Sequence, residues 1–197
     1  MSCNDKNHSV YASNCVCDVV KFINELQDVA QDSCPTGCEN PILGANCGST
    51  SPIANTRPFI LFDKKGQIFL PASCFNIKNN TSHFLLDISV PLPFLRAESV
   101  DDCCAVLGVL APDTSTLSEK AKEELAELIN RFITDEVDFQ AIARVLVCAY
   151  QNGVTFENNE HLVTEFFGLQ ATGFCITLDL DCFCAIQSLR DTFVMGV

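Results

Sequence analysis

The apolar residues near the start of the chain recur at helical spacing over residues 15–31. They are Val16, Val19, Ile23, Leu26 and Ala30. Residues three or four apart share one face of a helix, so this pattern predicts a helix that ends before Pro35. The polar residues 1–14 are expected to form a flexible arm. Residues 32–56, rich in Cys, Gly, Pro, Ser and Asn, are expected to form an irregular loop.

Shorter apolar runs in the next part of the chain predict β-strands. Residues 58–71 hold two apolar runs about an Asp-Lys-Lys-Gly turn, which is typical of a β-hairpin. Residues 83–90 alternate between apolar and polar positions, as a half-buried strand does. Residues 94–100 and 103–111 are predicted as the next two strands, joined by Asp101-Asp102. The second of them is apolar on both faces, as in the middle of a sandwich or under a covering helix.

Residues 116–153 change to a helical rhythm. Thr116 and Glu119 have the spacing of a capping box, and one apolar stripe follows them. A second stripe begins at Phe139 and ends at Asn152-Gly153, a pair that commonly stops a helix. The pattern predicts an αα-hairpin inserted between strands.

Two further strands are predicted near the end of the chain, at residues 162–169 and 174–181, with a hinge at 171–173. In the second strand apolar and polar residues alternate, which places Phe174 inward and Cys175 outward. Together the elements predict an α+β fold: an antiparallel β-sheet or sandwich with an N-terminal helix and the inserted αα-hairpin. Everything from residue 15 to residue 197 is expected to belong to this single domain.

The net negative charge of the chain disfavours some classes of binding partner. There are 12 Lys plus Arg and 25 Asp plus Glu, a net charge of −13. Nucleic acids and anionic membrane surfaces attract proteins through clustered basic residues, so neither is an expected partner. No apolar run approaches the roughly 18 residues of a spanning helix, so membrane insertion is not expected. The polar start lacks the apolar region of a secretory signal peptide, so Sec-type export is not expected either.

Thirteen cysteines among 197 residues are unusual for a chain without an export signal. The count is odd, so at least one thiol is free or pairs with another molecule. Three uses of so much sulfur compete: metal ligation, catalysis and cross-linking.

Metal ligation would make the chain a zinc-binding adaptor. Structural zinc sites commonly use Cys-x2-Cys pairs, and the chain has none. Cys34 and Cys38 flank a Pro-Thr-Gly turn and supply half of a site. The other half would have to come from Cys15 and Cys17, from Cys47 or from a histidine. A loop disulfide or free thiols explain the same pair. No cofactor or metal is therefore expected, and the zinc-binding adaptor stays as the alternative.

Catalysis has less support in the sequence. There is no Cys-x-x-Cys redox motif, Gly-rich phosphate loop, Gly-x-Ser-x-Gly elbow or His-Glu-x-x-His pair. A Cys–His dyad would draw on only three histidines, and thirteen cysteines make a chance pairing easy. The chain is not expected to be an enzyme, although a thiol-dependent enzyme remains a second alternative.

Cross-linking fits the spacing of the cysteines better. A Cys-x-Cys pair such as Cys15 and Cys17 rarely closes on itself, and these two fall in a first helical turn, where backbone amides favour the thiolate. Cys103 and Cys104 are adjacent, so one is expected to face inward and the other outward. Cys148 lies inside the second inserted helix and is interpreted as ordinary core filling.

Four stretches of the chain resemble the CotY/CotZ spore-coat proteins and the related exosporium protein ExsY of endospore-forming bacteria. They are VCDVVKFINELQD at 16–28 with the following SCPTGCENPILGA, NTRPFILF at 55–62, FLRAESVDDCCAVLGVL at 94–110, and CITLDLDCFCAIQSLRD at 175–191. The stretches are spread from end to end, and the last is the most specific.

The resemblance implies a structural protein of the spore surface layers, whether coat, crust or exosporium. Such a protein is made in the mother-cell cytoplasm without a signal peptide. It assembles with itself, as hexamers in a two-dimensional lattice, and with other coat or exosporium proteins. Intermolecular disulfides, formed on later oxidation, then reinforce the lattice.

Carried over by position, the matching stretches supply the expected cross-linking cysteines. They are Cys17, Cys34, Cys38, Cys103, Cys104, Cys175, Cys182 and Cys184, with Cys3 and Cys15 from an N-terminal region that also bears cysteines in the family. Two features depart from the family. Ser188 occupies a position where another cysteine is expected, and the αα-hairpin is longer and more helical than the usual connection.

Overall fold

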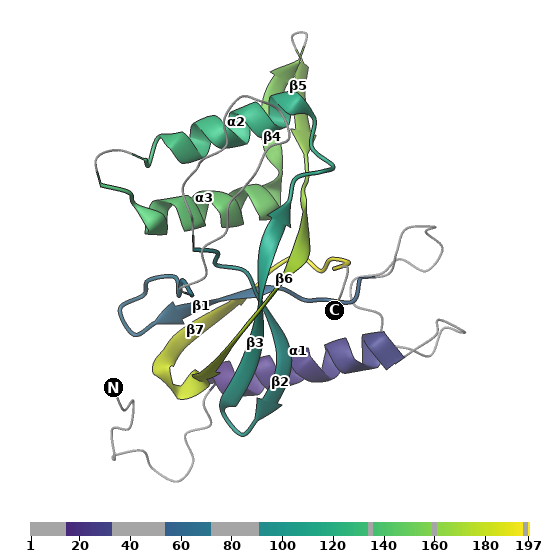
Figure 1. Ribbon diagram of the computed structural model, residues 1–197, viewed down its shortest axis with the longest axis vertical. Helices are drawn as coiled ribbons and strands as arrows, with labels where there is room; N and C mark the ends of the chain where they lie inside the picture. The colour runs from purple at the N-terminus through teal and green to yellow at the C-terminus, as the bar shows by residue number, and fades with distance from the viewer. Residues whose placement is uncertain (1–14, 33–53, 72–90, 134–135, 159–160, 195–196) are drawn as a thin grey trace.

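The computed structural model describes residues 15–32, 54–71, 91–133, 136–158, 161–194 and 197 (Figure 1). Its helices are α1 (Cys15–Asp32), α2 (Glu119–Asn130), α3 (Phe139–Asn152) and the short 3-10 helix η1 (Leu180–Cys182). Its strands are β1 (Phe59–Asp63), β2 (Leu95–Asp101), β3 (Cys104–Asp113), β4 (Val154–Asn158), β5 (His161–Glu165), β6 (Gly168–Asp179) and β7 (Phe183–Ser188). The arm predicted over residues 1–14, most of the predicted loop and the strand predicted at 83–90 lie outside the described residues.

The main sheet is antiparallel and has the strand order β6-β3-β2-β1-β7. The predicted α+β class is confirmed, with one five-stranded sheet, a separate β4–β5 hairpin and helices. β3 lies between β2 and β6, and six of its seven residues from Ala105 to Ala111 are buried. The middle of a strand with neighbours on both sides and cover on both faces has little contact with water, which is why its sequence is apolar on both faces.

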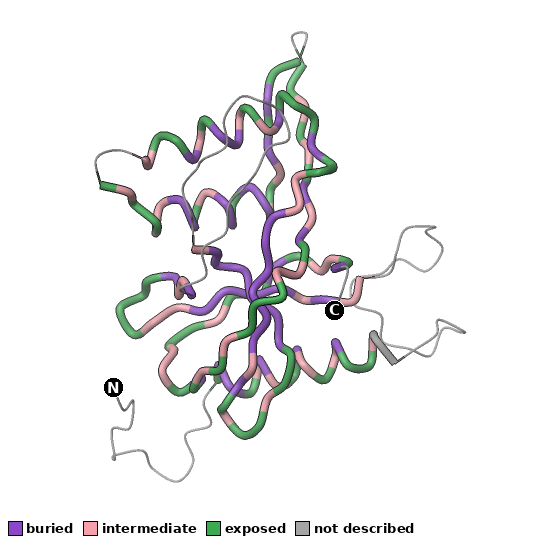
Figure 2. The backbone as a smooth tube through the Cα atoms, viewed as in Figure 1, coloured by how far each residue is buried: buried purple, intermediate pink, exposed green. Residues whose placement is uncertain are grey.

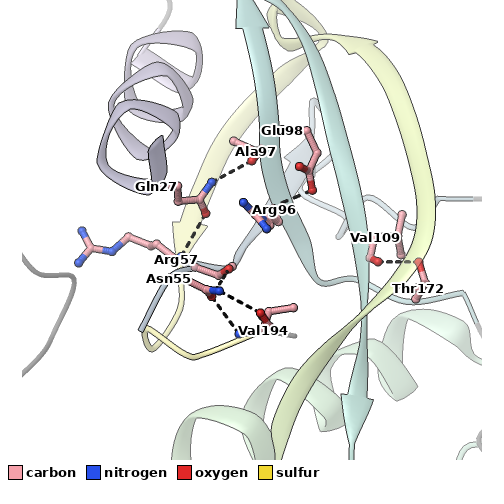
Figure 3. A network of polar contacts seen from close by, with 10 residues as sticks. Gln27, Asn55, Arg57, Arg96, Ala97, Glu98, Val109, Thr172 and Val194 are labelled. Carbon is pink, nitrogen blue, oxygen red and sulfur yellow. Dashed lines mark hydrogen bonds and ion pairs between the residues drawn. The ribbon is translucent and has the colours of Figure 1, made fainter. Parts of the chain in front are cut away.

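β1 and β2 separate after a single register pair, Phe59 with Leu95. α1 occupies the space that this separation opens, and it contacts both β2 and β7. Its buried residues include Val20 and Ile23, which join the common core with the inner faces of β1 and β3 (Figure 2). The side chain of Gln27, also buried, completes the hydrogen bonding between the two separated strands (Figure 3).

The predicted αα-hairpin is present as α2 and α3, and the β4–β5 hairpin lies beside it (Figure 1). The expected capping box is wrong. The N-cap of α2 is Ser118, whose Oγ accepts a hydrogen bond from the backbone N–H of Ala121 (3.3 Å). The hydroxyl of Thr116 instead donates to the carbonyl of Phe166 (3.2 Å). The predicted end of α3 is confirmed, because Gly153 follows it with φ +80°.

The hairpin predicted at residues 58–71 forms only in part. The turn is present, with Gly66 at φ +74°, and the run before it is β1. The run after it makes an isolated bridge from Ile68 to Phe62, and the Phe69 N–H donates to the Leu61 carbonyl (2.8 Å), but it forms no regular strand. The side-chain amide of Gln140 on α3 accepts a hydrogen bond from the Ile68 N–H (3.0 Å) and donates one to the Ile68 carbonyl (2.8 Å). It therefore satisfies the two backbone groups that a partner strand would satisfy.

The two strands predicted near the end of the chain are also wrong in detail. The stretch 162–169 divides between β5 and β6, and β6 continues through the predicted hinge. Gly173, at φ +72°, and a register shift against β3 mark an irregularity within one strand. Phe174, expected inward, is 50% exposed. β4 and β7 were not predicted. None of the described helices is long and apolar enough to cross a membrane.

Candidate functional site: a cysteine cluster at one end of the sheet

Three segments far apart in the sequence meet at one end of the five-stranded sheet. They are the first turn of α1, the turn between β2 and β3, and η1 (Figure 1, lower part). The backbone N–H of Leu180 in η1 donates to the carbonyl of Cys103 in the β2–β3 turn (2.8 Å). These segments carry five of the predicted cysteines, which we call the cysteine cluster: Cys15, Cys17, Cys103, Cys104 and Cys182.

A disulfide between Cys17 and Cys103 joins α1 to the β2–β3 turn. The two residues are 86 apart in the sequence, and their Cα atoms are 5.4 Å apart. Cys17 is 2% exposed and belongs to the hydrophobic core, whereas Cys103 is half-buried. Both were predicted to link neighbouring subunits. In the structure their bond is internal to one chain, so it fixes α1 against the sheet.

The turn that carries Cys103 is shifted by one residue from its predicted place. Asp101 pairs with Cys104, so Asp102 and Cys103 form the turn. Asp102 has φ +49°, in the left-handed region that Asp tolerates better than most residues. The prediction that one of the adjacent cysteines faces inward and the other outward is confirmed, because Cys103 points to Cys17 and Cys104 is exposed.

The rim of the cluster carries free thiols. Cys15 and Cys104 are both exposed and unbonded, whereas Cys182 is disulfide-bonded. Cys15 lies two residues from Cys17 on α1, yet one is exposed and the other buried, as expected for side chains that diverge around a helix. The cluster therefore has a disulfide at its centre and exposed free thiols at its edge.

Three more exposed free thiols lie away from the cluster. Cys175 is on β6, opposite Gly108, and its predicted outward position is confirmed. Cys184 is on β7, and its thiol donates to the carbonyl of Asp63 (2.8 Å). Cys148 is on α3.

The interpretation of Cys148 as core filling is wrong, because its side chain is exposed. The buried face of α3 includes Ile142 and Leu146, which point to the other side of the helix. Arg144 and Asn152, four residues before and after Cys148, are also exposed. Residues four apart share a helix face, so these two polar neighbours were the available signal of a solvent-facing position.

The described residues contain no group of three or more Cys, His, Asp or Glu side chains arranged to hold a metal ion. Of the cysteines named for the zinc alternative, Cys34, Cys38 and Cys47 lie outside those residues, as does Cys3. Cys15 and Cys17 lie within them, and Cys17 is disulfide-bonded. The prediction that Cys3, Cys34 and Cys38 form cross-links therefore stays a prediction.

The sequence was compared with protein families, and the model for spore coat protein Z matches residues 1–148 and 147–191. The chain belongs to this family. The predicted resemblance to the CotY/CotZ proteins is thereby confirmed. Spore coat protein Z of Bacillus subtilis (strain 168) is 28% identical to it over 188 residues, which cover 92% of this chain and 93% of that protein. No solved structure matches the chain. The spore coat protein Z match includes every segment of the cysteine cluster.

Proposed function

We propose that this chain is a structural, non-enzymatic component of the spore surface layers. It associates with copies of itself and with other coat or exosporium proteins into a two-dimensional sheet, with hexagonal order, and intermolecular disulfides then reinforce the contacts. Its membership of the spore coat protein Z family supports the location and the structural role. The arrangement of the free thiols supports the cross-linking.

The distribution of the exposed thiols carries the proposal. Among the described residues, five exposed free thiols lie on five different elements: Cys15 on α1, Cys104 on β3, Cys148 on α3, Cys175 on β6 and Cys184 on β7. A subunit with one or two reactive sites makes only dimers or linear chains. A subunit with three or more, on separate surfaces, can bond to enough neighbours to close a sheet. Each weak lateral contact then becomes durable through the links around it.

The net charge of −13 suits stepwise assembly. Like charge keeps reduced subunits apart until complementary surfaces meet, and it leaves the finished layer hydrophilic. Synthesis in the reducing mother-cell cytoplasm keeps exposed thiols free, and oxidation on the spore then joins them. Complementary subunit surfaces set the order of the sheet, and intermolecular disulfides make it permanent.

Oxidation of purified protein tests this proposal. Protein purified under reducing conditions and then exposed to air is expected to give ladders on a non-reducing denaturing gel and periodic arrays by negative-stain microscopy. Replacing by serine the five cysteines that are exposed in the described part of the chain is expected to shorten the ladder while arrays still form. The matched control is C17S/C103S, which removes two cysteines of the internal bond and is expected to keep the long ladder.

Wild-type protein that stays monomeric in air, with its exposed thiols still titratable and no arrays, would overturn the proposal. The zinc-binding alternative predicts a different result from the same material. Protein purified without oxygen would then contain stoichiometric zinc, and a chelator would unfold it.

A further inference from the structure

The internal disulfide presents its two sulfur atoms to different surroundings. Cys17 is 2% exposed and packs in the core, whereas Cys103 is half-buried in a turn between exposed Asp102 and exposed Cys104. A thiolate from solvent therefore approaches the bond from the Cys103 side. Thiol–disulfide exchange displaces the sulfur on the far side of the one attacked. Attack at Cys103 expels Cys17.

The start of α1 favours negative charge on Cys17, while burial in the core opposes it, so the sulfur leaves as a thiolate that is protonated at once. Cys17 is the third residue of α1, where backbone N–H groups have no partner inside the helix and favour negative charge. The carbonyl oxygen of Asp102 lies 3.0 Å from the Cys17 sulfur. Once the expelled thiolate has taken a proton, this carbonyl accepts a hydrogen bond from the new thiol.

Other contacts hold the surrounding fold in place when the bond breaks. The β2–β3 turn is also held by the hydrogen bond from the Leu180 N–H to the Cys103 carbonyl. α1 is also held by its buried residues Val20 and Ile23 and by the hydrogen bonds of Gln27. Exchange therefore requires no unfolding.

We propose that Cys103 is a site of thiol–disulfide exchange, at which an exposed cysteine of a second copy replaces Cys17. The incoming thiolate forms a bond to the Cys103 sulfur as the Cys17–Cys103 bond breaks. The electron pair leaves with the Cys17 sulfur, which takes a proton from water. The number of disulfides is unchanged, so no oxidant is consumed. The role of the second copy rests on the proposed function, whereas the exchange site itself does not.

Reduced glutathione, a small thiol, probes the site without a second copy. Protein that carries the internal bond is incubated with it under anaerobic, non-denaturing conditions, quenched with acid, alkylated and mapped by mass spectrometry. The expected products are glutathione on Cys103 and an alkylated Cys17. C17S, which has no internal bond, is the matched control and is expected to acquire no glutathione at Cys103. C104S is expected to react as the wild type does.

Glutathione on Cys17, or exchange only after denaturant is added, would overturn the exchange site. Mixing oxidised wild type anaerobically with reduced, tagged C17S/C103S tests the partner. A cross-linked peptide that joins Cys103 to the tagged chain is expected, and its absence would overturn the second copy as the source of the thiol. A sheet that forms in air although glutathione fails to exchange would leave the proposed function intact and this inference wrong.

Discussion

Gln27 on α1 donates a hydrogen bond from its side-chain amide to the backbone carbonyl of Ala97 on β2 (2.8 Å) (Figure 3). Its amide oxygen accepts a bond from the backbone N–H of Arg57 (3.1 Å). β1 and β2 pair at Phe59 and Leu95, so Arg57 and Ala97 would be the next hydrogen-bonding partners if the strands stayed together. One buried side chain thus replaces a link of the sheet and allows a helix to enter it.

Replacing Gln27 by Ala removes this bridge. Two buried backbone groups lose their partners, and each unsatisfied group costs roughly 1–3 kcal/mol, so we expect the free energy of unfolding to fall by about 2–4 kcal/mol in urea titrations. Exposed Glu25 on the same helix gives the matched control, because E25A is expected to change stability by less than about 0.5 kcal/mol. Equal effects of the two variants would contradict the bridging role.

The Tyr150 hydroxyl donates to the carbonyl of Arg190 (2.7 Å), and burial raises the pKa of Tyr150 above its ordinary value. The unfolded chain then loses the phenolic proton at a lower pH than the folded protein does. We expect stability to fall as the pH rises above about 10, the ordinary pKa of tyrosine.

The difference in unfolding free energy between wild type and Y150F isolates this contribution, since the other titrating groups are common to both. We expect the advantage of wild type over Y150F to shrink as the pH rises through this range. A direct check uses Y11F. The chain has two tyrosines, so this variant retains Tyr150 as its single tyrosine. Its phenolate absorbance should appear above the pH at which a free tyrosine ionises, and an ordinary titration would contradict the expectation.

The elements that were predicted correctly are long, periodic segments. α1, α2 and α3 each repeat an apolar stripe over at least three turns, and β2 and β3 are adjacent strands joined by a two-residue turn. Their formation is governed by neighbours in the sequence. β7 is different. It pairs with β1 across more than a hundred residues, and its six residues begin with only a four-residue apolar run, at 183–186, without strict alternation.

The candidate site was predicted as a set of cysteines, without their arrangement. The outward position of Cys175 follows from the alternation of side chains along a strand, which does not tell which of Cys103 and Cys104 faces outward. The bond between Cys17 and Cys103 depends on how α1 enters the sheet, which in turn depends on Gln27 meeting Ala97. Neither partner carries a local signal of the other, because connectivity is not encoded in spacing.

Gly108 on β3 leaves room for the carboxylate of Glu98. A Cβ atom at residue 108 would lie 2.5 Å from Glu98 Oε1. That carboxylate is 3.7 Å from the Nε of Arg96, a buried guanidinium whose pKa is lowered by desolvation. We expect G108A to lower the free energy of unfolding by about 0.5–1 kcal/mol, because the exposed end of the Glu98 side chain can turn aside but then loses its position beside Arg96.

A double-mutant cycle separates this contact from any general effect on the strand. If the clash with Glu98 is the cause, G108A should cost much less in an E98A background than in the wild type. An equal cost in both backgrounds would contradict the mechanism.

The rate of cross-linking should rise with ionic strength. Subunits carry a net charge of −13 and repel one another at long range. The screening length falls from about 10 Å at 0.1 M salt to about 3 Å at 1 M, so encounters between copies become more frequent. The measurement is the initial rate of ladder formation in air at several NaCl concentrations, with sucrose as a non-ionic control. A rate that falls with NaCl would indicate that attraction between unlike charges governs the contact.

The internal disulfide should stabilise the monomer, independently of any assembly. It closes a loop of 86 residues, and cross-links of this kind typically stabilise folded proteins by about 2–4 kcal/mol through the entropy of the unfolded chain. We expect C17S/C103S to unfold at a lower urea concentration by that amount, with the serine at residue 17 able to donate to the Asp102 carbonyl as the thiol would. C175S, which removes an exposed thiol, is the control and should match the wild type.

Because the double variant has lost this bond already, dithiothreitol should destabilise it less than it destabilises the wild type. Identical responses to dithiothreitol would show that the Cys17–Cys103 bond contributes nothing to stability.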